Sequence, residues 1–259
     1  MKLKNTPCVI LCGGKGTRLG KLTEKIPKPM LKISKHPILY YIISNYAKYG
    51  VEKFILLTGY KNEIINKYFK SLKGKIVRKN KNLEVFKVFF KKKILEINVL
   101  YTGINTKKKD RVNKAKKIIN SEIFFLTYGD GLGMVNIKSQ YNFHVKHKKL
   151  ITLLGTHPPS RFGELIIKND KVISLNEKPQ MSYGLINGGY MVCNTKIFSK
   201  FKQNRSDLEH GVINKLCSKG EVKCYENGNF WQCMDNEREF YLMRKLFFKN
   251  KKIKEFFNI

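Results

Sequence analysis

The sequence predicts an α/β fold with a mixed, mostly parallel β-sheet that is covered by helices on both faces. Short apolar runs alternate along the chain with longer segments of helical periodicity, as a sheet with crossover helices requires. A glycine-rich segment directly follows the first apolar run, and an acidic residue between two glycines follows a later one. At 259 residues, the chain is long enough to bury a full core. We therefore expect a Rossmann-like arrangement with a small additional β region and a C-terminal helix.

The individual elements follow from the spacing of apolar residues. The first strand is predicted at 8–11, and further strands at 54–59, 83–86, 98–101, 123–128, 151–155 and 188–193. A hairpin is predicted for 164–168 and 171–175, because Asn169-Asp170 suits the positive φ of a tight turn. Helices are predicted at 37–49, 62–69, 112–119, 137–148, 207–219 and 237–248. The basic, aromatic stretch 249–259 gives no clear prediction.

The segment from Leu11 to Leu19 carries the strongest functional signal. It reads Leu-Cys-Gly-Gly-Lys-Gly-Thr-Arg-Leu and is followed by Pro27-Lys28-Pro29-Met30. Glycines let backbone N–H groups approach an anion, and arginine adds a forked, permanently charged partner. Such a loop after a strand suits the phosphates of a nucleotide, although a glycine-rich turn by itself is as often only a turn. It is neither a Gly-x-Gly-x-x-Gly motif nor a Walker loop.

Together, the two segments resemble the signature of the sugar nucleotidyltransferases. The resemblance implies the nucleotide-diphospho-sugar transferase fold and a reaction at the α-phosphorus of a nucleoside triphosphate. It makes Arg18 and Lys28 the candidate catalytic residues. The candidate nucleotide-binding residues are Leu11, Cys12, Gly13, Gly14, Gly16, Thr17, Arg18, Lys28, Arg111 and Gly129. Arg111 aligns with a family segment that ends Gly-Gly-Arg, but Lys109-Asp110 stand here in place of the two glycines.

Asp130 and Asp235 are the candidate metal ligands. Asp130 follows the strand at 123–128, at the sheet edge where α/β proteins bind ligands. Tyr-Gly-Asp-Gly around Asp130 and Trp-Gln-Cys-Met-Asp ending at Asp235 resemble the metal-binding segments of the glucose-1-phosphate cytidylyltransferases. The implied cofactor is Mg²⁺, whose remaining positions waters and substrate phosphates fill. Taken alone, Asp130 could instead close a turn, and Asp235 could cap the last helix.

Three segments between the two aspartates resemble sugar-binding segments of the same family. They are Arg161-Phe162-Gly163, Glu177-Lys178-Pro179 and Asn187-Gly188-Gly189. The resemblance implies that Lys178 grips the sugar phosphate and that Glu177 accepts hydrogen bonds from sugar hydroxyls. The candidate sugar-phosphate-binding residues are Arg161, Gly163, Glu177, Lys178, Asn187 and Gly188. As isolated features, the second and third segments would be ordinary turns.

Charge and cysteine content argue against several classes of protein. The net charge is +33, but seven of the 52 basic residues are arginine, the residue that phosphate and base recognition favour, so we expect no nucleic acid partner. The six cysteines show no metal spacing, and we expect free, mostly buried thiols. The five histidines show no ligand spacing either, and His144 and His147 are expected on a helix surface. Without a long apolar run or a signal peptide, we expect a cytoplasmic protein with no membrane partner.

These observations lead to one predicted nucleotidyltransferase domain over residues 1–259. Within it, 1–135 is expected to bind the nucleotide, 136–235 the sugar phosphate, and 236–259 to form the C-terminal helix and tail. The resemblance implies a homo-oligomer that transfers a cytidylyl group from CTP to α-D-glucose 1-phosphate. Two alternatives stay open: UTP, dTTP or another sugar 1-phosphate as substrate, and a basic nucleic-acid-binding or regulatory module on a decayed transferase scaffold.

Overall fold

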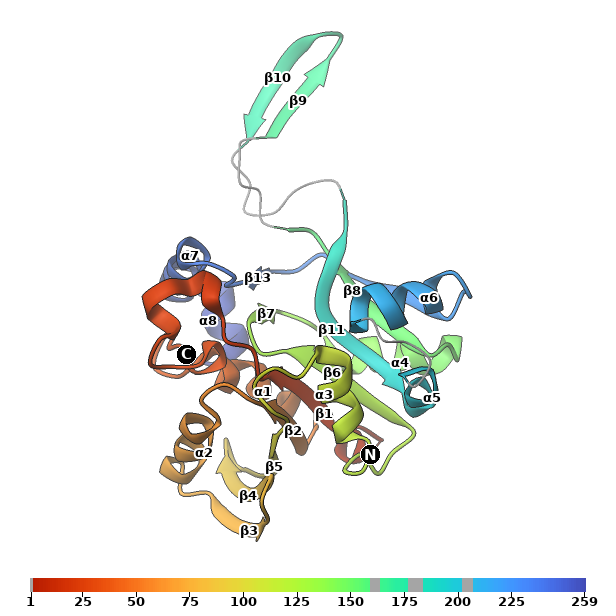
Figure 1. Ribbon diagram of the computed structural model, residues 1–259. Helices are drawn as coiled ribbons and strands as arrows, with labels where there is room; N and C mark the ends of the chain where they lie inside the picture. Colours follow the sequence, from red (N-terminus) through yellow and green to blue (C-terminus); the bar gives the residue numbers. More distant parts are fainter. Residues whose placement is uncertain (1, 159–163, 177–183, 202–206) are drawn as a thin grey trace.

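A nine-stranded sheet forms the centre of the molecule (Figure 1). The computed structural model describes residues 2–158, 164–176, 184–201 and 207–259. The strands of this sheet are β1 (Cys8–Cys12), β2 (Lys53–Thr58), β3 (Lys75–Lys79), β4 (Leu83–Phe90), β5 (Lys93–Tyr101), β6 (Ile123–Tyr128), β8 (Ile151–Thr156), β11 (Ile186–Asn194) and β12 (Val222–Asn227). Their order is β12-β8-β11-β6-β1-β2-β5-β4-β3, and β4 and β11 run against the others. The predicted mixed, mostly parallel sheet is therefore confirmed.

Helices cover both faces of the sheet because its central strands are apolar on both sides. In β1, Ile10 packs into one hydrophobic core and Val9 into the other, as alternation along a strand requires. The first core also takes residues from α1 (Ile38–Lys48), α2 (Asn62–Ser71), α4 (Ile137–His147), α7 (Glu237–Lys249) and α8 (Lys251–Phe257). The second takes residues from α3 (Lys108–Ala115), α5 (Phe198–Phe201) and α6 (Asn214–Cys217).

Most predicted helices are present, with three differences. The helix α3 begins at Lys108, before the predicted start at 112. The predicted helix over 207–219 is a π-helical segment, η5 (Leu208–Ile213), followed by the short α6. The stretch 249–259, which has no clear pattern in sequence, contains α8, whose Ile253 and Phe257 are buried in the first core. The two phenylalanines Phe247 and Phe257 stack there, which joins α7 and α8.

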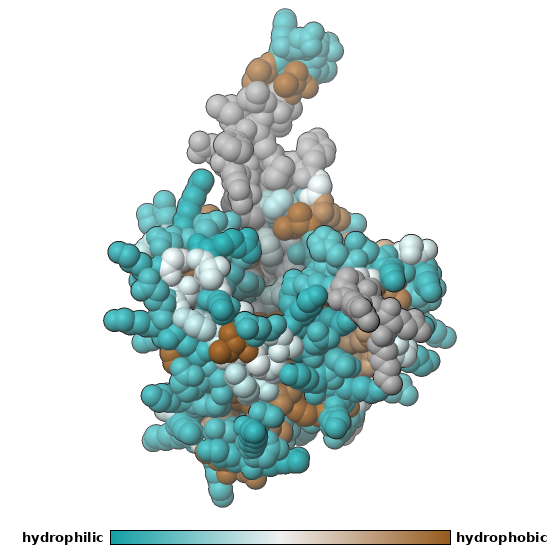
Figure 2. All heavy atoms as spheres, in the orientation of Figure 1, coloured by the Kyte–Doolittle hydropathy of each residue, from teal (hydrophilic) through white to brown (hydrophobic). Residues whose placement is uncertain are grey.

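Two small sheets lie outside the central one. The strands β7 (Gly131–Gly133) and β13 (Trp231–Cys233) pair antiparallel. The predicted hairpin is confirmed as β9 (Glu164–Lys168) and β10 (Lys171–Asn176), with positive φ at Asn169 and Asp170. In Figure 1 it stands apart from the nine-stranded sheet. Figure 2 shows apolar atoms on this hairpin, where Ile167, Val172 and Ile173 are exposed.

His144 is buried, which corrects the expectation that it lies on a helix surface. Its Nδ1 lies 2.8 Å from the Thr152 hydroxyl, and Nε2 of His147 lies 2.7 Å from the same oxygen. One hydroxyl, which can both donate and accept, therefore serves both rings. Burial and the nearby His147 lower the pKa of His144 to about 4. Helical periodicity missed this residue because its buried partner comes from the neighbouring strand β8.

The cysteines are free thiols, as predicted, but they are less buried than expected. Cys8, Cys12 and Cys193 are buried, whereas Cys217 and Cys224 are exposed and Cys233 is half-buried. Within the described part of the chain, no helix has the length and apolarity needed to span a membrane.

Candidate active site

The glycine-rich loop lies at the carboxyl end of β1. Gly16 has φ of +70°, a conformation that glycine adopts without strain, and a side chain there would press against Lys28. The Thr23 hydroxyl donates a 3.0 Å hydrogen bond to the Gly16 carbonyl. This bond connects the loop to the end of the 3₁₀ segment that follows it. The loop continues into the 3₁₀ segment η2 (Thr17–Thr23), and η3 (Lys28–Met30) follows before α1 begins. The predicted loop is thus present, but 3₁₀ segments separate it from the first α-helix.

Arg111 ties together the ends of three strands. Its guanidinium donates to the carbonyls of Thr58 and Gly13, both at 3.1 Å. It also donates to the Ile104 carbonyl at 2.9 Å and to the Thr102 hydroxyl at 2.6 Å. The side chain is buried, and burial lowers its pKa. These four bonds use most of the five donors of a guanidinium, so Arg111 acts on the loop that follows β1 as well as lining the space in front of it.

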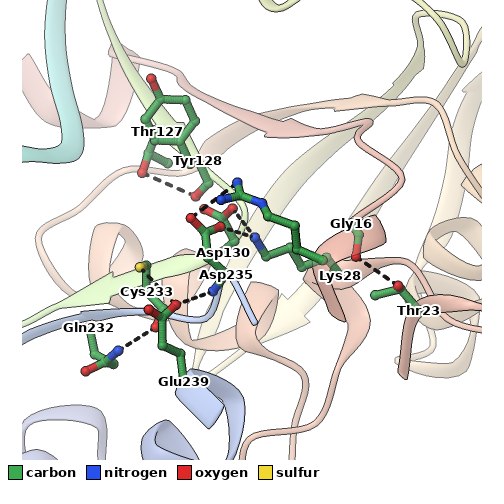
Figure 3. A network of polar contacts seen from close by, with 11 residues as sticks. Gly16, Thr23, Lys28, Thr127, Tyr128, Asp130, Gln232, Cys233, Asp235 and Glu239 are labelled. Carbon is green, nitrogen blue, oxygen red and sulfur yellow. Dashed lines mark hydrogen bonds and ion pairs between the residues drawn. The ribbon is translucent and has the colours of Figure 1, made fainter. Parts of the chain in front are cut away.

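Asp130 and Asp235 are brought together by the pairing of β7 with β13. Gly131 lies opposite Cys233 in this ladder, so the residue before β7 and the segment after β13 meet at one end of it. The Lys28 ammonium lies between the two carboxylates, 2.7 Å from Oδ2 of Asp130 and 2.6 Å from Oδ1 of Asp235 (Figure 3). Glu239 supports this arrangement from α7, because it accepts a 2.7 Å hydrogen bond from the Asp235 backbone N–H.

The three charges stabilise one another. Burial by itself would lower the pKa of Lys28, but its contacts with Asp130 and Asp235 raise that pKa above its ordinary value. Burial likewise opposes ionisation of Asp235, yet the hydrogen bond and charge of Lys28 lower the pKa of its carboxyl. Arg18 adds a weaker contact, with Nη2 3.4 Å from Oδ2 of Asp235 and three quarters of its side chain exposed. Lys28 is therefore charged, and it is the principal counter-ion of the pair.

All ten candidate nucleotide-binding residues line one cavity of about 450 Å³. The cavity lies between the glycine loop and the carboxyl ends of β5 and β6, and Asp130 and Asp235 are at its wall. Gly129 can sit here because a Cβ would come within 2.9 Å of the Leu11 carbonyl oxygen and of Pro29. The volume falls within the range of small-molecule sites. The structure thus brings these ten residues together around one cavity.

A second wall of the cavity was not predicted. Lys108, at the start of α3, lines the cavity and forms a 2.6 Å ion pair with Glu209 from η5. Tyr128 lines it as well and donates its hydroxyl proton to the same carboxylate. Burial and the charge of Glu209 raise the pKa of Tyr128, so this hydroxyl stays protonated. Lys109 and Asp110, which follow Lys108 in α3, do not line the cavity.

The candidate sugar site is described only in part. Arg161, Gly163, Glu177 and Lys178 lie outside the described residues. Asn187 is exposed, and its side-chain oxygen accepts from the Gly189 backbone N–H at 2.9 Å. The Gly188 carbonyl accepts a 2.8 Å hydrogen bond from Nε1 of Trp231, which links β11 to β13. Neither Asn187 nor Gly188 lines the cavity of the glycine loop.

Asp130 and Asp235 fit a small divalent cation. They offer carboxylate oxygens, the ligands that Mg²⁺ prefers, and a single ammonium reaches both of them. Among the described residues, no group of three or more His, Cys, Asp and Glu side chains is placed to hold a metal. Protein sites for Mg²⁺ commonly use one or two carboxylates together with water and substrate phosphates. The pair therefore fits a cation whose remaining coordination positions are filled by substrate phosphates.

Comparison with known proteins identifies relatives of this chain. A profile of the family described as nucleotidyl transferase matches residues 8–235. The chain belongs to this nucleotidyl transferase family. It is 35% identical over 242 residues to a probable glucose-1-phosphate cytidylyltransferase of Bacillus subtilis, covering 92% of this chain and 94% of that protein. It is 34% identical over 247 residues to the glucose-1-phosphate cytidylyltransferase of Salmonella typhimurium, covering 94% of this chain and 96% of that protein.

A solved structure shows the same fold. The crystal structure of a putative glucose-1-phosphate thymidylyltransferase from Bacillus anthracis superposes on this nucleotidyltransferase with a TM-score of 0.66. The two chains are 16% identical, and the match covers 98% of this chain and 99% of the other. The resemblance on which the fold was predicted is thus confirmed.

Several residues around the cavity of this nucleotidyltransferase were missed by sequence reasoning. They are Pro29, Ile104, Asn105, Thr106, Lys108 and Tyr128. Two signals point to them, because Pro29 and Tyr128 belong to motifs already singled out and Ile104 follows the end of β5. Residues after the carboxyl ends of parallel strands are the first place to look for ligand contacts. The pairing of Lys108 with Glu209 had no such signal, since the two residues are far apart in sequence.

Proposed function

We propose that this protein is a glucose-1-phosphate cytidylyltransferase, which transfers the cytidylyl group of CTP to α-D-glucose 1-phosphate and releases pyrophosphate. The observation that carries the proposal is the position of Lys28 between Asp130 and Asp235, at the wall of the cavity that the glycine loop lines. The choice of CTP and glucose 1-phosphate is supported by the two cytidylyltransferases that are 35% and 34% identical to this chain.

The reaction in this proposal is a direct, in-line attack of the sugar phosphate on the α-phosphorus of CTP. The attacking phosphate is ionised near neutral pH, so catalysis depends on positioning and on stabilisation of charge rather than on a general base. Lys28, whose raised pKa keeps it charged, stabilises the negative charge that develops on the α-phosphate. The amides of Gly13 to Thr17 and the Arg18 guanidinium hold the departing pyrophosphate. When bound to Asp130 and Asp235, Mg²⁺ neutralises phosphate charge.

The remaining candidate residues take supporting roles in the proposal. Arg111 positions the glycine loop through its bond to the Gly13 carbonyl. Lys178 orients the attacking phosphate. Glu177, Asn187 and Gly163 read the sugar, with Arg161 and Gly188 beside them. The support for the sugar-site roles is the family resemblance of their segments.

We propose that the chain forms one nucleotidyltransferase domain, as the sequence indicates. One domain over residues 1–259 is supported by the family match, which extends from 8 to 235. A cytoplasmic location is supported by free thiols at all six cysteines. The homo-oligomeric state comes from the family resemblance, and analytical ultracentrifugation of the purified protein tests it.

The function is tested by pyrophosphate release across four nucleoside triphosphates and several sugar 1-phosphates. We expect the highest kcat/KM with CTP and glucose 1-phosphate, and loss of turnover with EDTA or in Lys28→Ala. Faster turnover with UTP or dTTP, or with another sugar 1-phosphate, would change the proposed substrate but leave the proposed nucleotidyl transfer in place. A salt-sensitive shift of DNA that CTP does not compete, together with no turnover for any pair, would favour the nucleic-acid-binding alternative instead.

A further inference from the structure

The Lys28 ammonium lies between Asp130 and Asp235, the two carboxylates that the proposed function assigns to a divalent cation. Its two hydrogen bonds end on Oδ2 of Asp130 and Oδ1 of Asp235, at 2.7 Å and 2.6 Å. The side chain is 12% exposed, and Figure 3 shows it reaching from η3 toward both carboxylates. A lysine ammonium has three donors and no acceptor, so it satisfies two carboxylates as a small cation does.

The backbone at Lys28 and the base of its side chain are held in place. The residue lies between Pro27 and Pro29, and the turn closes with a 2.8 Å hydrogen bond from the Met30 N–H to the Pro27 carbonyl. Its aliphatic part packs against Gly16, where a Cβ would come within 3.3 Å of the Lys28 Cβ. Beyond this contact, the ammonium sits on a flexible four-carbon stem. The backbone position is therefore rigid, while the charged end can change partners.

We propose that Lys28 is an internal competitor of the divalent cation, which excludes the cation from Asp130 and Asp235 until a nucleotide triphosphate draws the ammonium away. A cation that approaches the pair meets a positive charge already bonded to the same oxygens, and it must break two charge-assisted hydrogen bonds. The phosphates of a nucleotide offer Lys28 other anionic partners in the cavity that it lines. This inference rests on the proposed function, because that function assigns the two aspartates to a cation.

The consequence is an order of assembly. The nucleotide-free protein holds a cation weakly, whereas the cation and the triphosphate strengthen each other's binding, since coupling between two ligands is reciprocal. Arg18 does not have the same effect, because it contacts one oxygen of Asp235 at 3.4 Å and is 75% exposed. The two residues thus form a natural comparison, with one buried bridging cation and one exposed non-bridging cation beside the same carboxylate.

The test measures Mn²⁺ binding to the full-length, EDTA-stripped protein without nucleotide, by electron paramagnetic resonance of free Mn²⁺. Wild type, Lys28→Met and the control Arg18→Met are titrated in parallel. Loss of a charge-assisted competitor should strengthen Mn²⁺ binding by about tenfold to a hundredfold in Lys28→Met, and by less than about threefold in Arg18→Met. Adding Asp130→Asn to Lys28→Met should abolish the gain. Unpaired carboxylates should also lower the Tm of Lys28→Met in EDTA, and Mn²⁺ should restore it.

Three results would overturn the proposal. They are equal Mn²⁺ affinity in wild type and Lys28→Met, an equal gain in Arg18→Met, or a gain that survives Asp130→Asn. If Lys28→Met does not fold, Lys28→Gln replaces it, and Lys28→Arg, which keeps the charge, should still bind Mn²⁺ weakly. Pyrophosphate release by the wild type is measured separately. Tight Mn²⁺ binding by Lys28→Met, together with no pyrophosphate release by the wild type for any substrate pair, would refute the proposed function and leave the competition in place.

Discussion

Arg111 should stabilise the fold measurably as well as serving the site, and Arg111→Met tests this. The substitution keeps an unbranched side chain but removes four hydrogen bonds, those to the Thr58, Gly13 and Ile104 carbonyls and to the Thr102 hydroxyl. Hydrogen bonds that involve a charged group contribute about 1.5–3 kcal/mol each. The Thr58 carbonyl keeps another donor in the Thr102 N–H at 2.9 Å, and the Gly13 carbonyl keeps the Tyr60 N–H at 3.3 Å. Removing the guanidinium also removes its cost of desolvation in the folded state, which offsets a further part of the lost hydrogen-bond energy. We therefore expect the free energy of unfolding to fall by about 3 kcal/mol, near the lower end of the range for breaking a buried charged contact.

The assay is equilibrium unfolding in urea, in which Arg111→Met should lower the midpoint without changing the slope. The control is Arg78→Met, because Arg78 lies exposed on the edge strand β3 and its loss should change stability by less than about 0.5 kcal/mol. The KM for the nucleotide should rise in Arg111→Met, since the glycine loop loses its anchor at Gly13. Unfolding free energies within about 1 kcal/mol of wild type, combined with a raised KM, would refute this reasoning and make Arg111 a ligand contact alone.

Three further outcomes are expected. Lys28→Ala should lower kcat for pyrophosphate release by at least about 100-fold at saturating substrate, because the positive charge that stabilises the α-phosphate is removed. Near-normal turnover would contradict that role. His144, whose pKa is lowered to about 4 by burial, binds a proton in the unfolded chain before it does in the folded one. Stability should therefore fall by about 2 kcal/mol between about pH 7.5 and pH 5 in thermal or urea unfolding, and His144→Gln should remove much of this dependence. Gly129→Ala should destabilise the protein by about 1–3 kcal/mol and raise the nucleotide KM, because a Cβ there comes within 2.9 Å of the Leu11 carbonyl; unchanged unfolding would show that the loop has room to shift.

The sequence was sufficient to predict most strands of the sheet and one side of the site because both depend on local patterns, but the edge strands β3 and β12 were not predicted. Apolar runs such as 123–128 identify strands buried on both faces, and the glycine loop and Asp130 each follow such a strand directly. Pairings between distant segments left no local trace. The contact between Lys108 and Glu209 joins residues 101 positions apart, and the buried position of His144 depends on Thr152 in another element.

The C-terminal stretch illustrates the same limit in the fold. The sequence allowed no clear prediction for 249–259, yet α8 places Ile253 and Phe257 in the first core beside α1 and α7. A helix of seven residues has little periodicity to detect, and tertiary packing rather than propensity stabilises it. For the candidate site, family resemblance supplied what spacing could not, namely that Asp130 and Asp235 belong together.

The ladder between β7 and β13 also bears on how the protein is made. Lys28 and Asp235 are 207 residues apart, so the last of the three charges leaves the ribosome long after the glycine loop. At about 5–20 residues per second, the interval is about 10–40 s. Until Asp235 is synthesised, the nascent chain contains at most one of the two aspartate partners of Lys28, and the second carboxylate follows the strand that closes the ladder. Completion of the candidate site is thereby coupled to a late step of synthesis, and a ribosome stalled before Trp231 would display the glycine loop without the paired carboxylates.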